Sequence, residues 1–181
     1  MLKWWLRRRI NAFEKEYDYD TSHMRYILDV SVGAALKFGR IMGLANYRKD
    51  VPLEASFAAA LTTLLAEDCG PCSQLVVTMG EREGVAPVTI KAILAGDERA
   101  MTPEAALGHR FTQATLQHAP GADALRDEII ARWGHRALVS LVCGITAARM
   151  FPTLKYALGY GKSCALIRVG NTQTEVSRKA A

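Results

Sequence analysis

Two cysteines set three positions apart, Cys69 and Cys72, are the residues of this sequence best suited to chemistry. A glycine and a proline separate them, and the helical pattern of Ser73–Glu83 follows. At the start of a helix, free backbone N–H groups and the positive end of the helix dipole stabilise a thiolate and lower the thiol pKa. The second thiol then closes a disulfide locally. The spacing therefore indicates a pair that cycles between dithiol and disulfide.

Two other interpretations of the pair stay open at this point: two buried, inert thiols, or half of a zinc site. A zinc ion needs two further ligands. The other cysteines and most of the histidines show no ligand spacing: Cys143, Cys164, His109, His118 and His135. We therefore expect neither a metal nor another cofactor. We interpret His109 and His118 as ordinary structural or surface histidines rather than catalytic bases.

The elements that must position the pair are helices. Apolar residues recur at helical spacing along nearly the whole chain, and glycine or proline marks most of the helix ends. Leu53–Ala66 leads into the pair, and a long apolar helix covers about Arg136–Leu158, with Pro152 expected to kink or break it. These patterns predict an all-α bundle of about eight helices.

The length of 181 residues fits a single domain. Within it we distinguish three parts: N-terminal helices in 1–50, a core in 53–159 and a tail in 162–181. In the tail, Cys164–Val169 and Thr172–Val176 flank Gly170-Asn171, which is a two-residue turn signal. The tail therefore predicts a short C-terminal β-hairpin.

The composition limits the class of protein. Half of the residues are hydrophobic and 23% are charged, which excludes a disordered chain. The longest uncharged runs in the apolar segments, such as Ala137–Ala148, are far shorter than the ~20 residues of a membrane-spanning helix, so we expect no transmembrane span. No apolar stretch follows the basic start Met1–Ile10, which argues against a signal peptide. Four cysteines without a signal peptide favour reduced thiols and a cytoplasmic protein.

The positive charge is concentrated at the two ends of the chain. Residues 1–10 carry +4 and residues 162–181 carry +3, so the net charge of +5 leaves −2 for residues 11–161. A protein that binds nucleic acid presents a basic face on its folded body. We therefore expect no nucleic-acid partner.

The Cys-Gly-Pro-Cys tetrapeptide also occurs in thioredoxins, where it follows a β-strand. Here the preceding residues, Ala58–Leu65, read as helix, so a thioredoxin fold is not expected. A better match runs from Leu53 to Gly159: an Ala/Leu helix enters the cysteine pair, and a helix over Ser73–Gly84, Val85-Ala86-Pro87 and further helices follow. This order resembles the alkyl hydroperoxidase D-like, carboxymuconolactone decarboxylase family.

The resemblance implies an all-helical fold that assembles into homo-oligomers. It also implies thiol-dependent reduction of hydroperoxides, with a thiol or dithiol as the reductant. The decarboxylase branch of the family generally lacks the cysteine pair, so the presence of Cys69 and Cys72 places this chain with the redox branch.

Two positions depart from the peroxidase motif of that family, which reads Glu, eleven residues, Cys-x-x-Cys, three residues, His. The glutamate position falls on Phe57 and the histidine position on Val76, and neither side chain carries a proton. Glu54 lies one helical turn before Phe57, about 5 Å along the axis. We weigh it equally as a proton carrier and as an acid that only stabilises a helix start after Pro52.

Glu67 and Asp68, directly before the pair, are the other candidates for a proton carrier. Two arguments favour different cysteines as the nucleophile. The resemblance points to Cys72, the cysteine nearer the family's proton relay. Helix-start electrostatics favour Cys69, which is the more N-terminal of the two and is expected to be the better exposed.

Two functions of different classes follow. The first is a Cys-x-x-Cys thiol oxidoreductase, acting on hydroperoxides or on disulfides, that lacks the relay residues. The alternative is a non-catalytic helical scaffold or partner-binding protein that retains the fold. We also expect a homo-oligomer, because the first helix carries an apolar stripe that includes Trp5, Phe13 and Tyr17.

Overall fold

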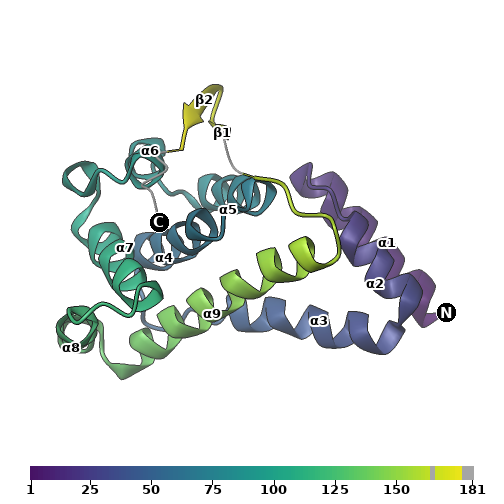
Figure 1. Cartoon of the computed structure of the whole chain (residues 1–181), viewed down its shortest axis with the longest axis horizontal. Helices are drawn as coiled ribbons and strands as arrows, with labels where there is room; N and C mark the ends of the chain where they lie inside the picture. The colour runs from purple at the N-terminus through teal and green to yellow at the C-terminus, as the bar shows by residue number, and fades with distance from the viewer. Residues whose placement is uncertain (164–165, 177–181) are drawn as a thin grey trace.

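The computed structural model describes residues 1–163 and 166–176, and these residues form nine α-helices, one short 3₁₀ helix and a two-stranded antiparallel sheet (Figure 1). The elements are α1 (Leu2–Tyr17), α2 (Ser22–Val30), α3 (Val32–Ala45), α4 (Leu53–Ala66), α5 (Gly70–Glu83), α6 (Pro87–Ala95), η1 (Glu98–Ala100), α7 (Pro103–Leu116), α8 (Ala122–Trp133), α9 (His135–Ala157), β1 (Leu166–Val169) and β2 (Thr172–Glu175). The all-α prediction with a short C-terminal hairpin is confirmed.

Helix α4 lies at the centre of the bundle. It packs against α5, α6, α7 and α9, and eight of its fourteen residues are buried. Alanines are frequent on this helix, and their small side chains let neighbouring helices come close. The closest approach is to α7, where Gly108 faces the backbone of Ala55.

We expect Gly108→Ala to destabilise the protein by about 1–3 kcal/mol. A Cβ at this position would stand 2.4 Å from the carbonyl oxygen of Ala55, and that backbone atom cannot move aside as a side-chain tip can. Gly39→Ala is the matched control, because Gly39 lies inside α3 with open space around it. The control should gain about 0.5–1 kcal/mol from the better helix former. Urea unfolding of both variants measures the difference, and equal stabilities would contradict the close crossing.

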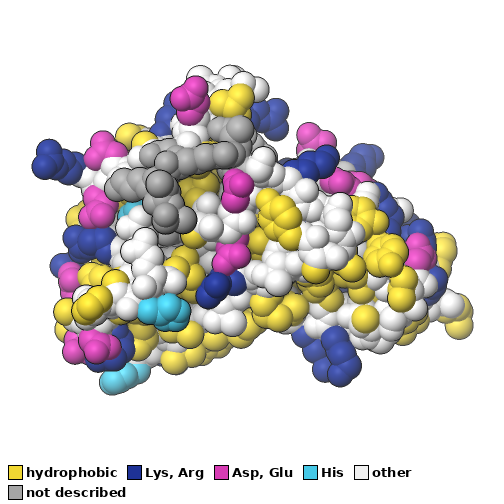
Figure 2. Space-filling model, viewed as in Figure 1, with side chains coloured by type: hydrophobic (Ala, Val, Ile, Leu, Met, Phe, Trp, Pro, Cys, Tyr) yellow, Lys and Arg dark blue, Asp and Glu magenta, His cyan; other side chains and the backbone are white. Residues whose placement is uncertain are grey.

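The N-terminal helices α1, α2 and α3 gather at one end of the molecule, away from α6, α7 and α8 (Figure 1). Helix α3 runs along α9, and α1 packs against α2 and α5. Neither α1 nor α3 has a fully buried residue. Hydrophobic side chains therefore remain visible along the side of the molecule where α3 and α9 lie (Figure 2).

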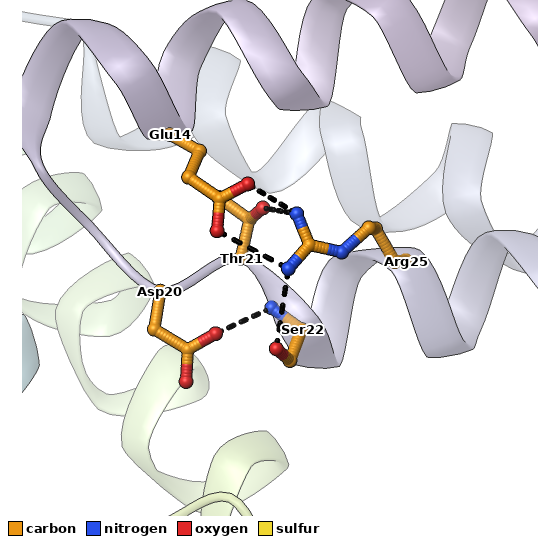
Figure 3. Close-up of polar contacts among 5 residues, drawn as sticks. All are labelled: Glu14, Asp20, Thr21, Ser22 and Arg25. Atoms are coloured by element: carbon orange, nitrogen blue, oxygen red, sulfur yellow. Dashed lines mark hydrogen bonds and ion pairs between the residues drawn. The ribbon is translucent and has the colours of Figure 1, made fainter.

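A polar network fixes the turn between α1 and α2 (Figure 3). The Arg25 guanidinium pairs with the Glu14 carboxylate and donates to Thr21 Oγ1 at 2.9 Å and Ser22 Oγ at 3.2 Å. Asp20 Oδ1 accepts from the Ser22 backbone N–H at 2.9 Å. The network therefore holds residues 18–22 in one conformation, and this turn carries Tyr19 into the core, where it is 7% exposed.

Helix α9 is continuous from His135 to Ala157, so the break that Pro152 suggested does not occur. Pro152 removes one backbone donor, but it is buried, and tertiary packing sustains the helix around it. By length and composition this helix is apolar enough to cross a membrane, with a mean hydropathy of 1.6 over 18 residues, of which 39% are buried inside the protein. A core helix of a soluble protein meets the same criterion, so one such helix is weak evidence for a span.

The predicted hairpin forms with β1 and β2 around Gly170-Asn171, and Gly170 adopts the left-handed φ of +56° that this turn requires. Ile167 and Val169 are buried in the core beneath it. The Gln74 side chain bonds both backbone groups of Arg168, at 2.8 and 3.0 Å. The hairpin is thereby fastened to the first turns of α5. Cys164, which we had included in the first strand, lies outside the described residues.

Candidate functional site

The cysteine pair lies in the turn from α4 to α5 and in the first helical turn that follows. Asp68 takes a left-handed conformation, φ 48°, that reverses the chain, and Cys69 is the N-cap of α5. Helix α5 begins at Gly70 rather than at Ser73 as expected, because Pro71 has a φ suited to a first turn. Cys72 therefore already belongs to the helix, close to the positive end of its dipole.

A disulfide joins Cys69 to Cys72, with 5.3 Å between their Cα atoms. Both cysteines pack in a small apolar cluster with Leu64 and Ala148, against which Val76 and Phe151 also pack. Cys69 is fully buried and Cys72 is 4% exposed. The expectation that Cys69 would be the better exposed of the two is therefore wrong.

Cys72 borders an apolar cavity of about 150 Å³. The cavity lies among α1, α2, α3, α4, α5 and α9 and the turn that carries Tyr19. Its apolar lining includes Met24, Met42, Leu75, Val76, Met79 and Phe151. Cys69 does not belong to the lining, and it is fully buried within the apolar cluster. An apolar group of a substrate thus has room beside one sulfur of the pair. An engineered apolar cavity of about 150 Å³ binds a molecule the size of benzene.

The C-terminal part of α9 and the segment after it cover the cysteine turn. Arg149 Nε pairs with Glu67 Oε1 at 2.8 Å, and the Tyr156 hydroxyl donates to the Asp68 carbonyl oxygen at 2.8 Å. The Gly70 N–H donates to the Lys162 carbonyl oxygen at 3.1 Å. Glu67 is thus beside the pair, as expected, but its carboxylate is committed to a cation.

Glu54 lies at the far end of α4. Its carboxylate accepts a hydrogen bond from the Thr102 hydroxyl, which also caps α7. Ten residues separate Glu54 from Leu64, the α4 residue that packs on the cysteines, which is about 15 Å along the axis. The structure therefore brings Glu67 to the pair and does not bring Glu54 there.

The two positions that depart from the peroxidase motif are both apolar contacts. The Phe57 ring covers Gly80 so closely that a Cβ on that glycine would stand 2.3 Å from the ring. Val76 is half-buried, lies four residues after Cys72 on α5 and borders the same cavity. Phe57 also borders this cavity, but it does so at Gly80, about two turns beyond Cys72 along α5, whereas Val76 lies one turn from Cys72.

The remaining candidates lie away from the pair. His109 is buried between α7 and α4, with its Nδ1 2.7 Å from Thr62 Oγ1, and His118 is exposed at the end of α7. Cys143 is half-buried in α9. Among the described residues, no three His, Cys, Asp or Glu side chains are placed to hold a metal ion.

Sequence reasoning missed a buried polar cluster near the cavity: Tyr19, His23 and Lys155. The Lys155 ammonium donates to the Tyr19 hydroxyl at 3.2 Å and stands 4.7 Å from the ring centre. The His23 ring stacks edge-on against Tyr19, with 6.0 Å between centroids. One signal was available in the sequence, because Lys155 shares a helix face with Ala148 and Phe151.

Burial, with a smaller contribution from the nearby Lys155 charge, lowers the pKa of His23 to about 4. Its folded pKa is below the unfolded value of about 6.5, so the unfolded chain binds the extra proton and stability is lost as the pH falls through this window. We expect the free energy of unfolding to fall by about 2 kcal/mol between pH 7 and pH 5. Urea unfolding at both pH values measures it. His23→Gln should remove most of the difference, and an unchanged slope in that variant would contradict the assignment.

No protein-family model, curated protein or solved structure matches this chain. The functional argument therefore rests on the geometry of the cysteine pair and its surroundings.

Proposed function

We propose that this chain is a thiol oxidoreductase in which Cys69 and Cys72 cycle between dithiol and disulfide. One observation carries the proposal: a disulfide-bonded Cys-x-x-Cys pair stands at the start of α5, and only Cys72 borders an apolar cavity. A structural disulfide needs no such access, whereas a reactive sulfur needs room for its partner.

Cys72 is the attacking residue in this proposal and Cys69 the resolving one. The Cys72 thiolate attacks one sulfur of a substrate disulfide, a mixed disulfide forms, and one substrate thiolate leaves. Cys69, once deprotonated, attacks the Cys72 sulfur, and the second substrate thiolate leaves. The substrate gains two electrons, and the protein ends with the Cys69–Cys72 disulfide. An external thiol or dithiol then reduces this disulfide by the reverse exchange.

A hydroperoxide is the second substrate class that this proposal covers, in keeping with the resemblance to the alkyl hydroperoxidase D-like family. Cys72 attacks the terminal oxygen, the O–O bond breaks, and an alcohol leaves with a proton. Cys69 then displaces water from the sulfenic acid and closes the disulfide. This route needs a proton at the leaving oxygen. With Val76 and Phe57 at the relay positions, we expect it to be slower than disulfide exchange.

A non-catalytic scaffold is the second candidate, and the burial of the pair favours it. Cys69 is fully buried, and buried cysteines in apolar surroundings are usually inert. In that case the disulfide would only brace the α4–α5 turn.

The pKa values of the reduced thiols separate the two candidates. The rate of alkylation of Cys69 and Cys72, followed by peptide mass spectrometry as a function of pH, gives both values. A pKa below about 7.5 for Cys72 supports the oxidoreductase, whereas two values above about 8.5 support the scaffold. Cys143 is the internal reference, because it lies half-buried in α9 and away from the start of any helix.

We also propose that the chain forms a homo-oligomer. Phe13 and Tyr17 of α1 pack on the body of the protein, but Trp4 and Trp5 remain about half exposed or more. An open groove between α3 and α9 is lined by apolar residues that include Phe38, Ile41 and Leu154. Apolar surface of this extent is typical of interfaces. Sedimentation at tens of micromolar should show a species heavier than the monomer, and a monomer alone would contradict the proposal.

A further inference from the structure

Lys155 is a buried cation whose position no structural need of the bundle explains. It is 2% exposed, and no described carboxylate lies within ion-pair distance of its ammonium group. Burying an ammonium group is costly unless it is paired or hydrogen-bonded. Its described contact is the Tyr19 side chain, through the hydroxyl and the ring face. A methionine of the same length would fill this space at lower cost.

Backbone geometry places this cation close to the cysteine pair. Ala148 and Phe151 belong to the apolar packing around Cys69 and Cys72, and Lys155 follows Phe151 by one turn on the same face of α9. Four residues rise about 6 Å along the axis. Helical side chains lean toward the N-terminus, so the Lys155 stem runs back in the direction of the cysteine cluster. Tyr19, which holds the ammonium group, borders the same cavity as Cys72.

We propose that Lys155 is a positioning residue for the thiol chemistry: its ammonium group, held in the core by Tyr19, stabilises the thiolate of Cys72. This inference rests on the proposed function and names the group that activates its nucleophile. It also gives the polar network of Figure 3 a role, because that network fixes the turn that carries Tyr19.

The other charges around the site do not cancel this effect. Burial lowers the pKa of Lys155, and the charge of Lys162 also lowers it. The Asp20 carboxylate acts in the opposite direction and favours the charged ammonium group. Beside the pair, Glu67 is neutralised by Arg149. Asp68 is exposed to solvent on the outer side of the turn. His23 is neutral at pH 7, because its pKa is lowered to about 4. Lys155 is therefore the buried charge of this group, and the exposed Asp20 carboxylate compensates it only in part.

The magnitude follows from Coulomb's law. A unit charge about 10 Å from a thiolate, in a protein with an effective dielectric constant of about 20, changes the thiol pKa by about one unit. A change of one unit is about tenfold in the thiolate fraction when the pKa lies above the working pH.

The test compares Lys155→Met with Lys155→Arg, which keeps the charge, and with Lys91→Met, which removes an exposed lysine from α6. The pH dependence of Cys72 alkylation in the reduced protein gives its pKa. We expect Lys155→Met to raise this pKa by about one unit, with the other two variants within about 0.3 units of the unmodified protein. Lys155→Gln carries the same test if the methionine variant does not fold.

An unchanged Cys72 pKa in Lys155→Met, or in Lys155→Gln, would overturn the inference. A structural role for Lys155 changes stability without moving the thiol pKa, so the readout separates the two roles. A failure of the proposed function is a different result, because it would appear in the unmodified protein as a cysteine pair that does not cycle with glutathione.

Discussion

Replacing Val76 by histidine is expected to raise the rate of hydroperoxide reduction by about 10²–10⁴-fold. Val76 follows Cys72 by four residues on α5, so the two side chains stand one above the other on the same helix face. Both border the cavity, which leaves room for an imidazole without burying it in the closed core. A histidine there accepts the thiol proton and returns one to the leaving oxygen, whereas valine does neither.

Val76→Asn is the matched control, because asparagine is polar and of similar size but neither gains nor loses a proton near neutral pH. Peroxide consumption coupled to a dithiol reductant measures both variants. The gain should appear with histidine alone and should be lost again in the double variant with Cys72→Ser. If the unmodified protein already reduces a hydroperoxide as fast as the histidine variant, a proton carrier other than position 76 operates, and Glu67 and Asp68 are the acids directly before the pair.

Phe57→Glu should not produce the same gain. Phe57 is 6% exposed, and its ring lies against Gly80 within the core. A carboxylate there would be buried without a partner, which is strongly unfavourable. The two departures from the peroxidase motif are therefore unequal. Both positions border the cavity, but Val76 is half-buried one turn from Cys72, whereas Phe57 is nearly fully buried against Gly80, farther along α5.

The two cysteine variants are expected to differ in whether a mixed disulfide with the substrate accumulates. Cys72→Ser should abolish disulfide exchange, because only Cys72 borders the cavity. Cys69→Ser should block turnover but allow the first attack, so that Cys72 accumulates as a mixed disulfide with the substrate. Glutathione disulfide is a suitable probe, and intact-mass spectrometry reports the adduct.

The adduct should form on the Cys69→Ser variant and not on Cys72→Ser, and Cys143→Ser in each background removes a competing thiol. The reverse pattern, with the adduct on Cys69, would show that the buried cysteine is the nucleophile and that the cavity is not the route of access.

Much of the fold could be predicted because local signals agree with packing. Gly84 and Gly96 end their helices in the left-handed conformation, and Thr102 caps α7, all as their residue types indicate. The Gly170-Asn171 turn forms the expected hairpin for the same reason. Pro152 misled because burial and packing of the surrounding helix outweigh the loss of one backbone hydrogen bond.

Residue types and their spacing predicted which residues belong to the candidate site, but not their burial or their contacts with distant parts of the chain. The cysteine spacing identified the pair, but exposure depends on what α9 and the segment after it place over the turn, and this buries Cys69. Glu54 was a candidate because it lies one helical turn before Phe57, the position of the family's glutamate, yet it lies at the end of α4 that is far from the pair. The helix face of Lys155 could be read from the sequence, but its contact with Tyr19 could not, because that contact joins residues 136 positions apart.

The redox equilibrium of the Cys69–Cys72 pair with glutathione tests the central claim most directly. The protein is equilibrated in buffers of graded glutathione and glutathione disulfide, the free thiols are trapped by alkylation, and the fraction oxidised is read by mass spectrometry. We expect a reversible two-electron transition with a reduction potential between about −180 and −270 mV, the range of thiol oxidoreductases. A pair that stays fully oxidised under the most reducing buffer, below about −300 mV, would be a structural disulfide and would contradict the account, as would a pair that never oxidises.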